Sequence, residues 1–194
     1  MGLSVMILGL VLFFAAHIFT TKRDARAKML ARFGGSTYKV LYSLVSLAGL
    51  VLIIWGFAHY RATGVIVVWN PPKAFKCITL PLMLPAVILV VASYIRGRIF
   101  LTLKHPMLAS IKLWAVGHLF ASGDLGAVIL FGSFLVWAVY DRLSMRWRSD
   151  SGAPPIPVGG ITNDLIAVAV GVVAYLVLTF VFHPVVIGTP VVGA

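Results

Sequence analysis

The sequence predicts an all-α, polytopic membrane helix bundle with about six transmembrane helices, and three features indicate this class. Of the 194 residues, 61% are apolar and only 11% are charged, and the mean hydropathy is +1.04. A soluble domain has about 25% charged residues. The apolar residues also gather into runs close to the roughly 20 residues that cross a bilayer. We therefore expect residues 1–194 to form a single integral-membrane domain within a lipid bilayer.

Six apolar runs alternate with charged or turn-forming segments. The runs cover residues 3–20, 40–58, 77–95, 106–122, 125–140 and 165–182. The predicted loops are 61–75, which contains an Asn-Pro-Pro turn signal, and 142–160, which is rich in Pro and Gly. Residues 99–104 are predicted to be a connector at the membrane interface.

Two runs depart from a regular span. Pro81 and Pro85 lie inside the third run and predict a kink near its start. The fourth and fifth runs meet at Gly123-Asp124, and the fifth has only 16 residues. Since 16 helical residues rise about 24 Å, less than the ~30 Å hydrocarbon core, we expect this hairpin to stop short of the far surface.

Basic residues are distributed unevenly along the chain. There are 16 Lys and Arg against five acidic residues, all of them Asp, and the net charge is +11. Thirteen of the 16 follow the first, third and fifth runs or begin the next run. Because Lys and Arg collect on the cytoplasmic side of membrane proteins, this bias places both chain termini outside. The charge is thus explained by topology, and no nucleic-acid partner is expected.

Histidine is the main candidate for chemistry within the bundle. The chain has no glutamate and no Asp at the centre of a run, which disfavours a proton- or cation-coupled transporter. Its single cysteine, Cys77, excludes an internal disulfide and a cysteine-rich metal cluster. Neutral histidine is the common protein ligand of haem iron.

The five histidines differ in their sequence context. His17 and His118 lie inside apolar runs, where we favour an iron ligand over a hydrogen-bonded core histidine. His59 and His183 fall at predicted outer ends of spans, where an interfacial role is favoured. His105 precedes Pro106 and is placed to help end a loop.

Geometry limits which histidines can share one iron. Two axial nitrogens lie about 4 Å apart, whereas His105 and His118 are 13 residues apart, or about 20 Å along a helix. His17 and His59 fall at opposite sides of the membrane. The pairs left open are His17 with His105, His17 with His118, and His59 with either His118 or His183.

Several motifs resemble the NnrU family of membrane proteins. They are Lys104–Leu108 (KHPML), Leu113–Leu119 (LWAVGHL), Ser122–Leu125 (SGDL), Phe131-Gly132, and His17 followed by an arginine-rich segment. The resemblance covers nearly the whole chain. Ser122 replaces the Asn that usually precedes Gly-Asp.

The resemblance implies a function at a haem. The family is associated with bacterial denitrification and nitric-oxide metabolism, and its relatives, the plastid 15-cis-zeta-carotene isomerases, resemble membrane haem b proteins with histidine ligands. It implies a bacterial inner-membrane protein that binds haem b, with His17 and His118 as iron ligands and His59 and His105 as further family histidines. The chemistry it implies is redox or isomerase-like, alongside other membrane enzymes of nitrogen-oxide metabolism.

Cations near the inner surface are candidate partners for haem propionates. Lys112 is two helical turns from His105 on the same face, and charge-assisted hydrogen bonds to carboxylates are strong. Arg96, Arg98 and Lys104 lie nearby in sequence. For Arg96 and Arg98 we favour contact with lipid headgroups.

Two other functions stay open. The first is a non-catalytic accessory or assembly factor for nitrogen-oxide reductases. The second is a membrane methyltransferase, because the His105-Pro106 element is similar to the His-Pro motif of isoprenylcysteine-type enzymes. The glutamate of those enzymes has no counterpart here, since the chain contains none.

Overall fold

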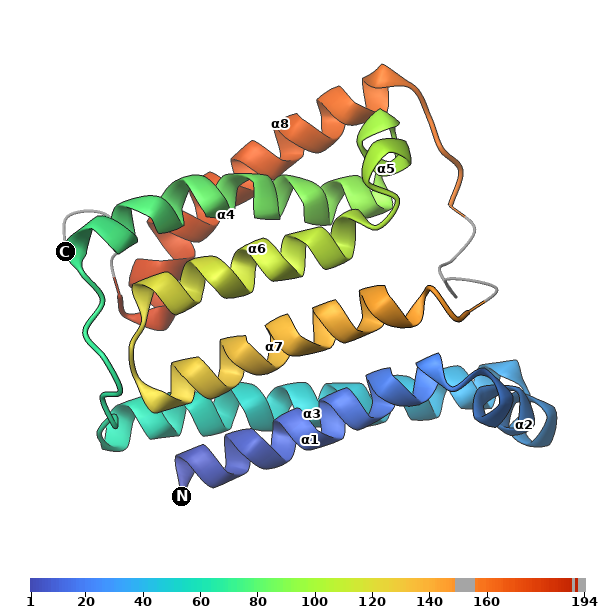
Figure 1. Cartoon of the computed structure of the whole chain (residues 1–194), viewed down its shortest axis with the longest axis horizontal. Helices are drawn as coiled ribbons and strands as arrows, with labels where there is room; N and C mark the ends of the chain where they lie inside the picture. The colour runs from blue at the N-terminus through green and yellow to red at the C-terminus, as the bar shows by residue number, and fades with distance from the viewer. Residues whose placement is uncertain (149–155, 190, 192–194) are drawn as a thin grey trace. The chain divides into compact units, whose positions relative to one another are not determined.

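The computed structural model describes residues 1–148, 156–189 and 191, and its secondary structure is helical. Helices make up 82% of the structure, without a strand in the described part. In chain order they are α1 (Gly2–Thr21), α2 (Arg23–Phe33), α3 (Gly35–Thr63), α4 (Lys73–Tyr94), α5 (Arg98–Leu103), α6 (Pro106–Ala121), α7 (Leu125–Ser144), α8 (Ile161–Val177) and the π-helix η1 (Leu178–Ile187) (Figure 1). The predicted all-α membrane class is confirmed.

Five of the described helical segments are long and apolar enough to span a membrane. They are Gly2–Thr21, Gly35–Thr63, Cys77–Tyr94, Leu125–Ser144 and Ile161–Ile187. The sixth apolar segment, α6, has 16 residues and is as short as predicted. In contrast, α7 is longer than predicted: it continues through Asp141 and Arg142 and reaches 20 residues, about 30 Å. Asp141, within this extension, is ion-paired with Arg148 at 2.8 Å.

Two segments outside the predicted spans are also helical. The basic stretch after the first span forms α2, whose backbone groups are satisfied within the helix. The predicted connector, residues 99–104, largely coincides with the short helix α5. The last span is longer than its apolar run, because α8 continues without a break into η1.

The chain folds into two compact units. Unit 1 comprises Met1–Asn70 and Ser122–Gly152, and unit 2 comprises Pro71–Ala121 and Ala153–Ala194. Unit 1 therefore holds α1, α2, α3 and α7, and unit 2 holds α4, α5, α6, α8 and η1. Each unit has helix packing of its own, and the single-domain organisation stays a prediction.

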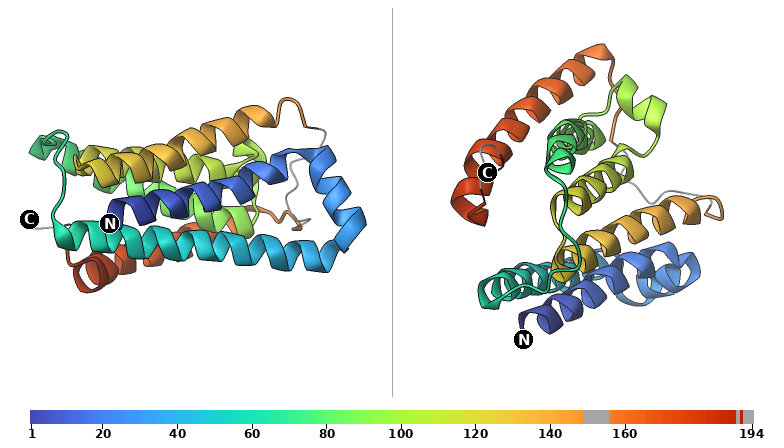
Figure 2. Two further views of the ribbon diagram at one scale, coloured as in Figure 1. Left: turned by 90° about the horizontal axis from the view of Figure 1, so that it is seen from below. Right: turned by 60° about the vertical axis from the view of Figure 1, so that its left-hand side comes forward.

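The core of unit 1 is a close contact between α1 and α3, which run antiparallel side by side (Figures 1 and 2). A Cβ atom at Gly9 would lie 2.6 Å from the backbone nitrogen of Ile53, and one at Gly49 would lie 2.8 Å from that of Phe13. Small residues allow membrane helices to approach this closely. The four glycines of this contact are Gly2, Gly9, Gly49 and Gly56.

In unit 2, α4 packs against both α6 and α8. The buried Ser110 hydroxyl on α6 donates to the carbonyl oxygen of Ala86 on α4 at 2.7 Å. On the α8 side, a Cβ atom at Gly171 would lie 2.7 Å from a side-chain carbon of Ile88. Interhelical hydrogen bonds and small residues, which hold membrane helices together, thus both contribute here.

Arg96 has a different role from the one predicted. Its side chain is buried, with 8% of the residue exposed. The guanidinium donates to the carbonyl oxygen of Ile156 at 3.2 Å and lies 4.2 Å from the ring centroid of Phe100. The carbonyl oxygen of Arg96 accepts from the side chain of Asn163 at 2.8 Å. Arg96 therefore fixes the segment before α8 and does not reach the lipid headgroups, whereas Arg98 is exposed.

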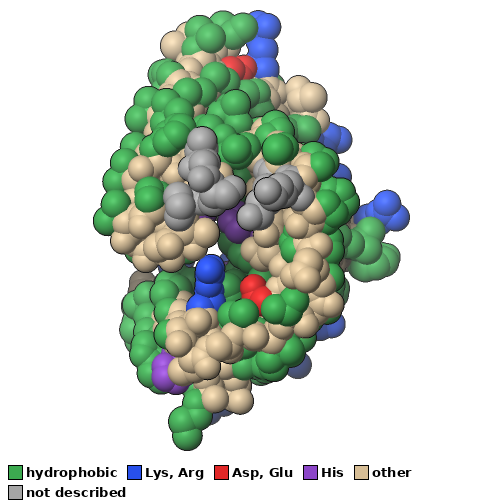
Figure 3. Space-filling view, turned by 90° about the vertical axis from the view of Figure 1, so that its left-hand side faces the viewer, with side chains coloured by type: hydrophobic (Ala, Val, Ile, Leu, Met, Phe, Trp, Pro, Cys, Tyr) green, Lys and Arg blue, Asp and Glu red, His purple; other side chains and the backbone are tan. Residues whose placement is uncertain are grey.

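Large apolar side chains remain exposed along the spans. Val136 on α7 and Val173 on α8 are 69% and 60% exposed. Figure 3 shows that hydrophobic side chains cover much of the visible surface and that charged ones are few. Exposed apolar surface on this scale marks an interaction surface, and lipid is the partner for which apolar spans are suited.

We expect Gly9→Ala and Gly49→Ala to destabilise the protein, because each added methyl group would strike backbone of the opposing helix. Overpacking of this kind costs about 1–3 kcal/mol. The measurement is thermal unfolding of the detergent-purified protein by circular dichroism. Gly132→Ala on α7 is the matched control, because its new methyl group meets no described atom within 4 Å. A Gly9→Ala melting temperature equal to that of Gly132→Ala would contradict the packing.

Candidate functional site

His17 lies in the penultimate turn of α1, within unit 1, and is surrounded by aromatic rings. Its Nδ1 is 2.7 Å from the carbonyl oxygen of Phe13, and the Phe13 ring stacks on it with centroids 4.0 Å apart. The rings of Tyr42 and Trp137 lie at 5.5 and 5.4 Å. Since a carbonyl oxygen only accepts, Nδ1 carries the proton and Nε2 carries the lone pair.

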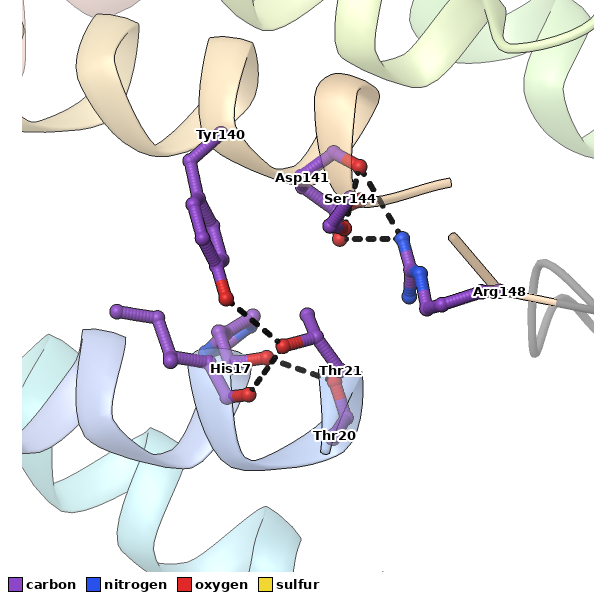
Figure 4. A network of polar contacts seen from close by, with 8 residues as sticks. His17, Thr20, Thr21, Tyr140, Asp141, Ser144 and Arg148 are labelled. Atoms are coloured by element: carbon purple, nitrogen blue, oxygen red, sulfur yellow. Dashed lines mark hydrogen bonds and ion pairs between the residues drawn. The ribbon is translucent and has the colours of Figure 1, made fainter. Parts of the chain in front are cut away.

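A polar network continues from His17 toward the end of α7 (Figure 4). The Thr20 hydroxyl donates to the carbonyl oxygen of His17 at 2.7 Å. In the next position, the hydroxyls of Thr21 and Tyr140 are 3.1 Å apart. Beyond them, the guanidinium of Arg148 donates to the carboxylate of Asp141 at 2.8 Å. Of these contacts, the one between Thr21 and Tyr140 joins the C-terminal end of α1 to α7 within unit 1.

His118 lies near the C-terminal end of α6, in unit 2, and is held in the same way as His17. Its Nδ1 is 2.8 Å from the carbonyl oxygen of Trp114, four residues earlier, so the proton is again on Nδ1. The neighbouring Gly117 is used for helix packing: a Cβ atom there would strike Met83, and its carbonyl oxygen accepts from Thr79 at 2.9 Å.

His183 approaches His118 within unit 2. The two ring centroids are 6.3 Å apart with planes inclined by 27°. His183 belongs to η1, and its Nδ1 is 2.8 Å from the carbonyl oxygen of Leu178, five residues earlier. The sequence did not suggest this pair, because a π-helix shifts the register that a 3.6-residue period predicts. Such helices are frequent at functional sites.

The remaining predicted site residues are divided between the two units. His59 is near the C-terminal end of α3 and stacks on Trp55, with centroids 5.5 Å apart. Because α1 and α3 are antiparallel, His17 and His59 lie at opposite ends of this helix pair. His105 directly precedes α6 and Lys112 lies on it, both half-buried in unit 2. In the described part of the chain, no three His, Cys, Asp or Glu side chains gather as a metal cluster.

The Ser-Gly-Asp-Leu motif forms a structural junction in unit 1. The carbonyl oxygen of Gly123 accepts from the backbone N–H groups of Val68 and Trp69 at 2.8 and 3.1 Å. The N–H of Leu125 donates to the carbonyl oxygen of Ile66 at 2.8 Å. This junction attaches the segment after α3 to the start of α7.

Asp124, in the same motif, caps α7. Its carboxylate accepts from the backbone N–H of Ala127 at 2.9 Å, which satisfies one of the first N–H groups of the helix. The buried ring of Tyr60 lies against Gly126, where a Cβ atom would strike it. The motif therefore specifies how α7 begins.

The apolar spans and the histidines within them define a helical integral membrane protein. A comparison of the sequence with known families assigns it further: residues 5–191 match the family described as NnrU protein. The chain therefore belongs to the NnrU family, as its motifs predict. No curated protein and no solved structure matches it.

We expect Asp124→Ala to lower the free energy of unfolding by about 1 kcal/mol, because the α7 N-terminus loses its cap. Asp124→Asn keeps a side-chain oxygen that accepts the same hydrogen bond, and it should retain most of the stability. Thermal unfolding in detergent measures both variants. An Asp124→Ala protein as stable as the Asn variant would show that the cap contributes nothing.

Proposed function

We propose that this NnrU-family membrane protein binds haem b, with His17 and His118 as the iron ligands. One observation carries the proposal: each of these imidazoles donates its Nδ1–H to the carbonyl oxygen four residues earlier. Each therefore holds its lone pair on Nε2, in an orientation set by the helix backbone. Metal-ligating histidines are typically held by such a hydrogen bond, and histidine is a common ligand of haem iron.

The surroundings of the two histidines suit a flat apolar macrocycle. Aromatic rings from α1, α3 and α7 border His17, and the indole of Trp114 lies 5.3 Å from the His118 ring. In this proposal the chain's own residues orient the imidazoles and exclude water. Lys112 on α6 is the proposed partner of a propionate. The family histidines His59 and His105 are proposed to contribute to cofactor binding without ligating the iron.

Bound haem b would supply one-electron redox or Lewis-acid chemistry. We propose that the protein uses it in nitrogen-oxide metabolism, for a redox or isomerase-like reaction, in line with the family resemblance. We also propose the bacterial inner membrane as its location, with both termini in the periplasm. The distribution of Lys and Arg supports this orientation, because 13 of 16 fall on one predicted side.

The optical spectrum of the protein tests haem binding. We expect protein purified in detergent from haem-replete cells to show a Soret band that shifts on reduction. His17→Ala and His118→Ala should each reduce haem occupancy, by about tenfold or more, since even changes to the residues that support a metal ligand cost 10–100-fold. Cys77→Ser is the control: its thiol is exposed and outside the proposed ligand set, so the spectrum should not change.

Two results would overturn the proposal. One is wild-type protein without a Soret band, and the other is a band that neither histidine variant changes. Haem-free protein that co-purifies with a nitrogen-oxide reductase would instead favour the accessory role.

A further inference from the structure

Unit 1 contains a cavity of about 260 Å³ where α1, α2 and α3 meet. Most of its lining residues lie at the end of the α1–α3 pair where α2 connects the two helices (Figure 2). Four of its lining side chains are cationic, three others are polar or aromatic, and the described lining includes no carboxylate. The lining residues are Thr20, Arg23, Arg26, Tyr38, Lys39, Tyr42 and Arg148.

Three buried donors in this lining lack an acceptor. They are Nε of Arg26, the hydroxyl of Tyr38 and Nε of Arg148, none of which has a hydrogen-bond partner among the described residues. Tyr38 is only 8% exposed, and the side chain of Arg148 only 7%. Buried polar groups are nearly always hydrogen-bonded, so unmet donors that share one cavity need an explanation. An anion bound in the cavity would provide one.

Arg148 is ion-paired with Asp141 and still has one donor that no described residue accepts. Its Nη2 donates to the carbonyl oxygen and to the carboxylate of Asp141, at 3.1 and 2.8 Å. That pairing fixes the guanidinium at the cavity wall and still leaves Nε without an acceptor. Arg26 is likewise positioned by its neighbour, since its guanidinium carbon lies 5.8 Å from the ring centroid of Tyr38.

We propose that this cavity binds a phosphate group. Phosphate offers several acceptor oxygens in a tetrahedral arrangement, and the planar guanidinium of arginine recognises it with paired hydrogen bonds. The unmet donors come from α2, α3 and the segment after α7, so one compact, multidentate anion satisfies them better than a single carboxylate does. The binding is independent of the proposed haem.

Position and size indicate which phosphates fit. The cations of the cavity belong to the predicted cytoplasmic side, where anionic lipids hold their phosphates next to basic residues. The cavity admits a headgroup phosphate or a small soluble phosphate. Both sources present the same chemistry, and binding experiments distinguish them.

The first experiment compares probes on the full-length protein in neutral detergent. We expect phosphatidylglycerol to raise the melting temperature, since a ligand that binds only the folded state stabilises it. Diacylglycerol with the same acyl chains lacks the phosphate and should have no effect. Inorganic phosphate is the soluble arm: a rise with phosphate alone identifies a soluble ligand, and a rise with the lipid alone identifies the headgroup.

The second experiment compares variants by native mass spectrometry of the bound phospholipid or phosphate. Tyr38→Phe removes only the unmet hydroxyl, and Arg26→Gln removes a charged donor. We expect affinity to fall roughly three- to tenfold for the former and about tenfold or more for the latter, since hydrogen bonds to charged groups are strong. Lys28→Gln is the matched control: this exposed α2 cation is outside the lining, and affinity should stay within about twofold.

The melting temperature of each variant without ligand shows whether a loss of binding is caused by a loss of stability. Because the Tyr38 hydroxyl has no acceptor among the described residues, Tyr38→Phe should melt at or above the wild-type temperature without ligand. A loss of stability in that variant would overturn the proposal, because the hydroxyl would then have a partner. Binding of neither probe, or equal loss in Lys28→Gln, would also overturn it. If haem displaced the bound probe, the cavity would be a site for the haem propionates, and the phosphate assignment would be overturned.

Discussion

The contact of backbone against backbone between α1 and α3 determines the arrangement of unit 1. Its glycines leave no room for a methyl group, so the antiparallel helices have one register. That register sets His17 beside Tyr42 and places His59 at the other end of the pair. It also brings the start of α3 against the end of α1, and the cationic cavity forms there. Both candidate features of unit 1 therefore depend on how closely these two helices approach.

Histidines in the two units are held by the same kind of local hydrogen bond. In α1 and in α6, the carbonyl oxygen four residues earlier accepts the Nδ1 proton, and this needs no partner from another helix. In η1 the acceptor is five residues earlier, because the π-helix turns more slowly. Helical backbone thus sets the tautomer of His17, His118 and His183. What differs between them is the surroundings, which are mainly aromatic at His17 and include a second histidine at His118.

Two arginines of this chain have different roles, and the amino-acid composition does not reveal this difference. Arg96 is buried and hydrogen-bonded to the segment before α8, with Phe100 beneath its guanidinium. Arg148 is equally buried, but only part of its guanidinium has a partner among the described residues. The first residue stabilises a loop, and the second is positioned at a cavity with donors left over. A structural arginine has an acceptor for each of its hydrogen-bond donors, whereas a candidate ligand-binding arginine keeps a buried donor without one. Charge alone does not separate the two.

The class, the positions of the spans and the family follow from the sequence alone. A bilayer offers no hydrogen bonds to the backbone, so each span must satisfy its own peptide groups as a helix, and apolar runs therefore mark the spans directly. Motifs around His105, His118 and Asp124 likewise sufficed to predict the NnrU family. Only the tertiary structure decided that α7 continues past Asp141, that η1 brings His183 to His118, and that Arg148 returns to line a cavity with Tyr38. The last two depend on packing between residues far apart in the chain, and local hydrophobicity carries no information about such contacts.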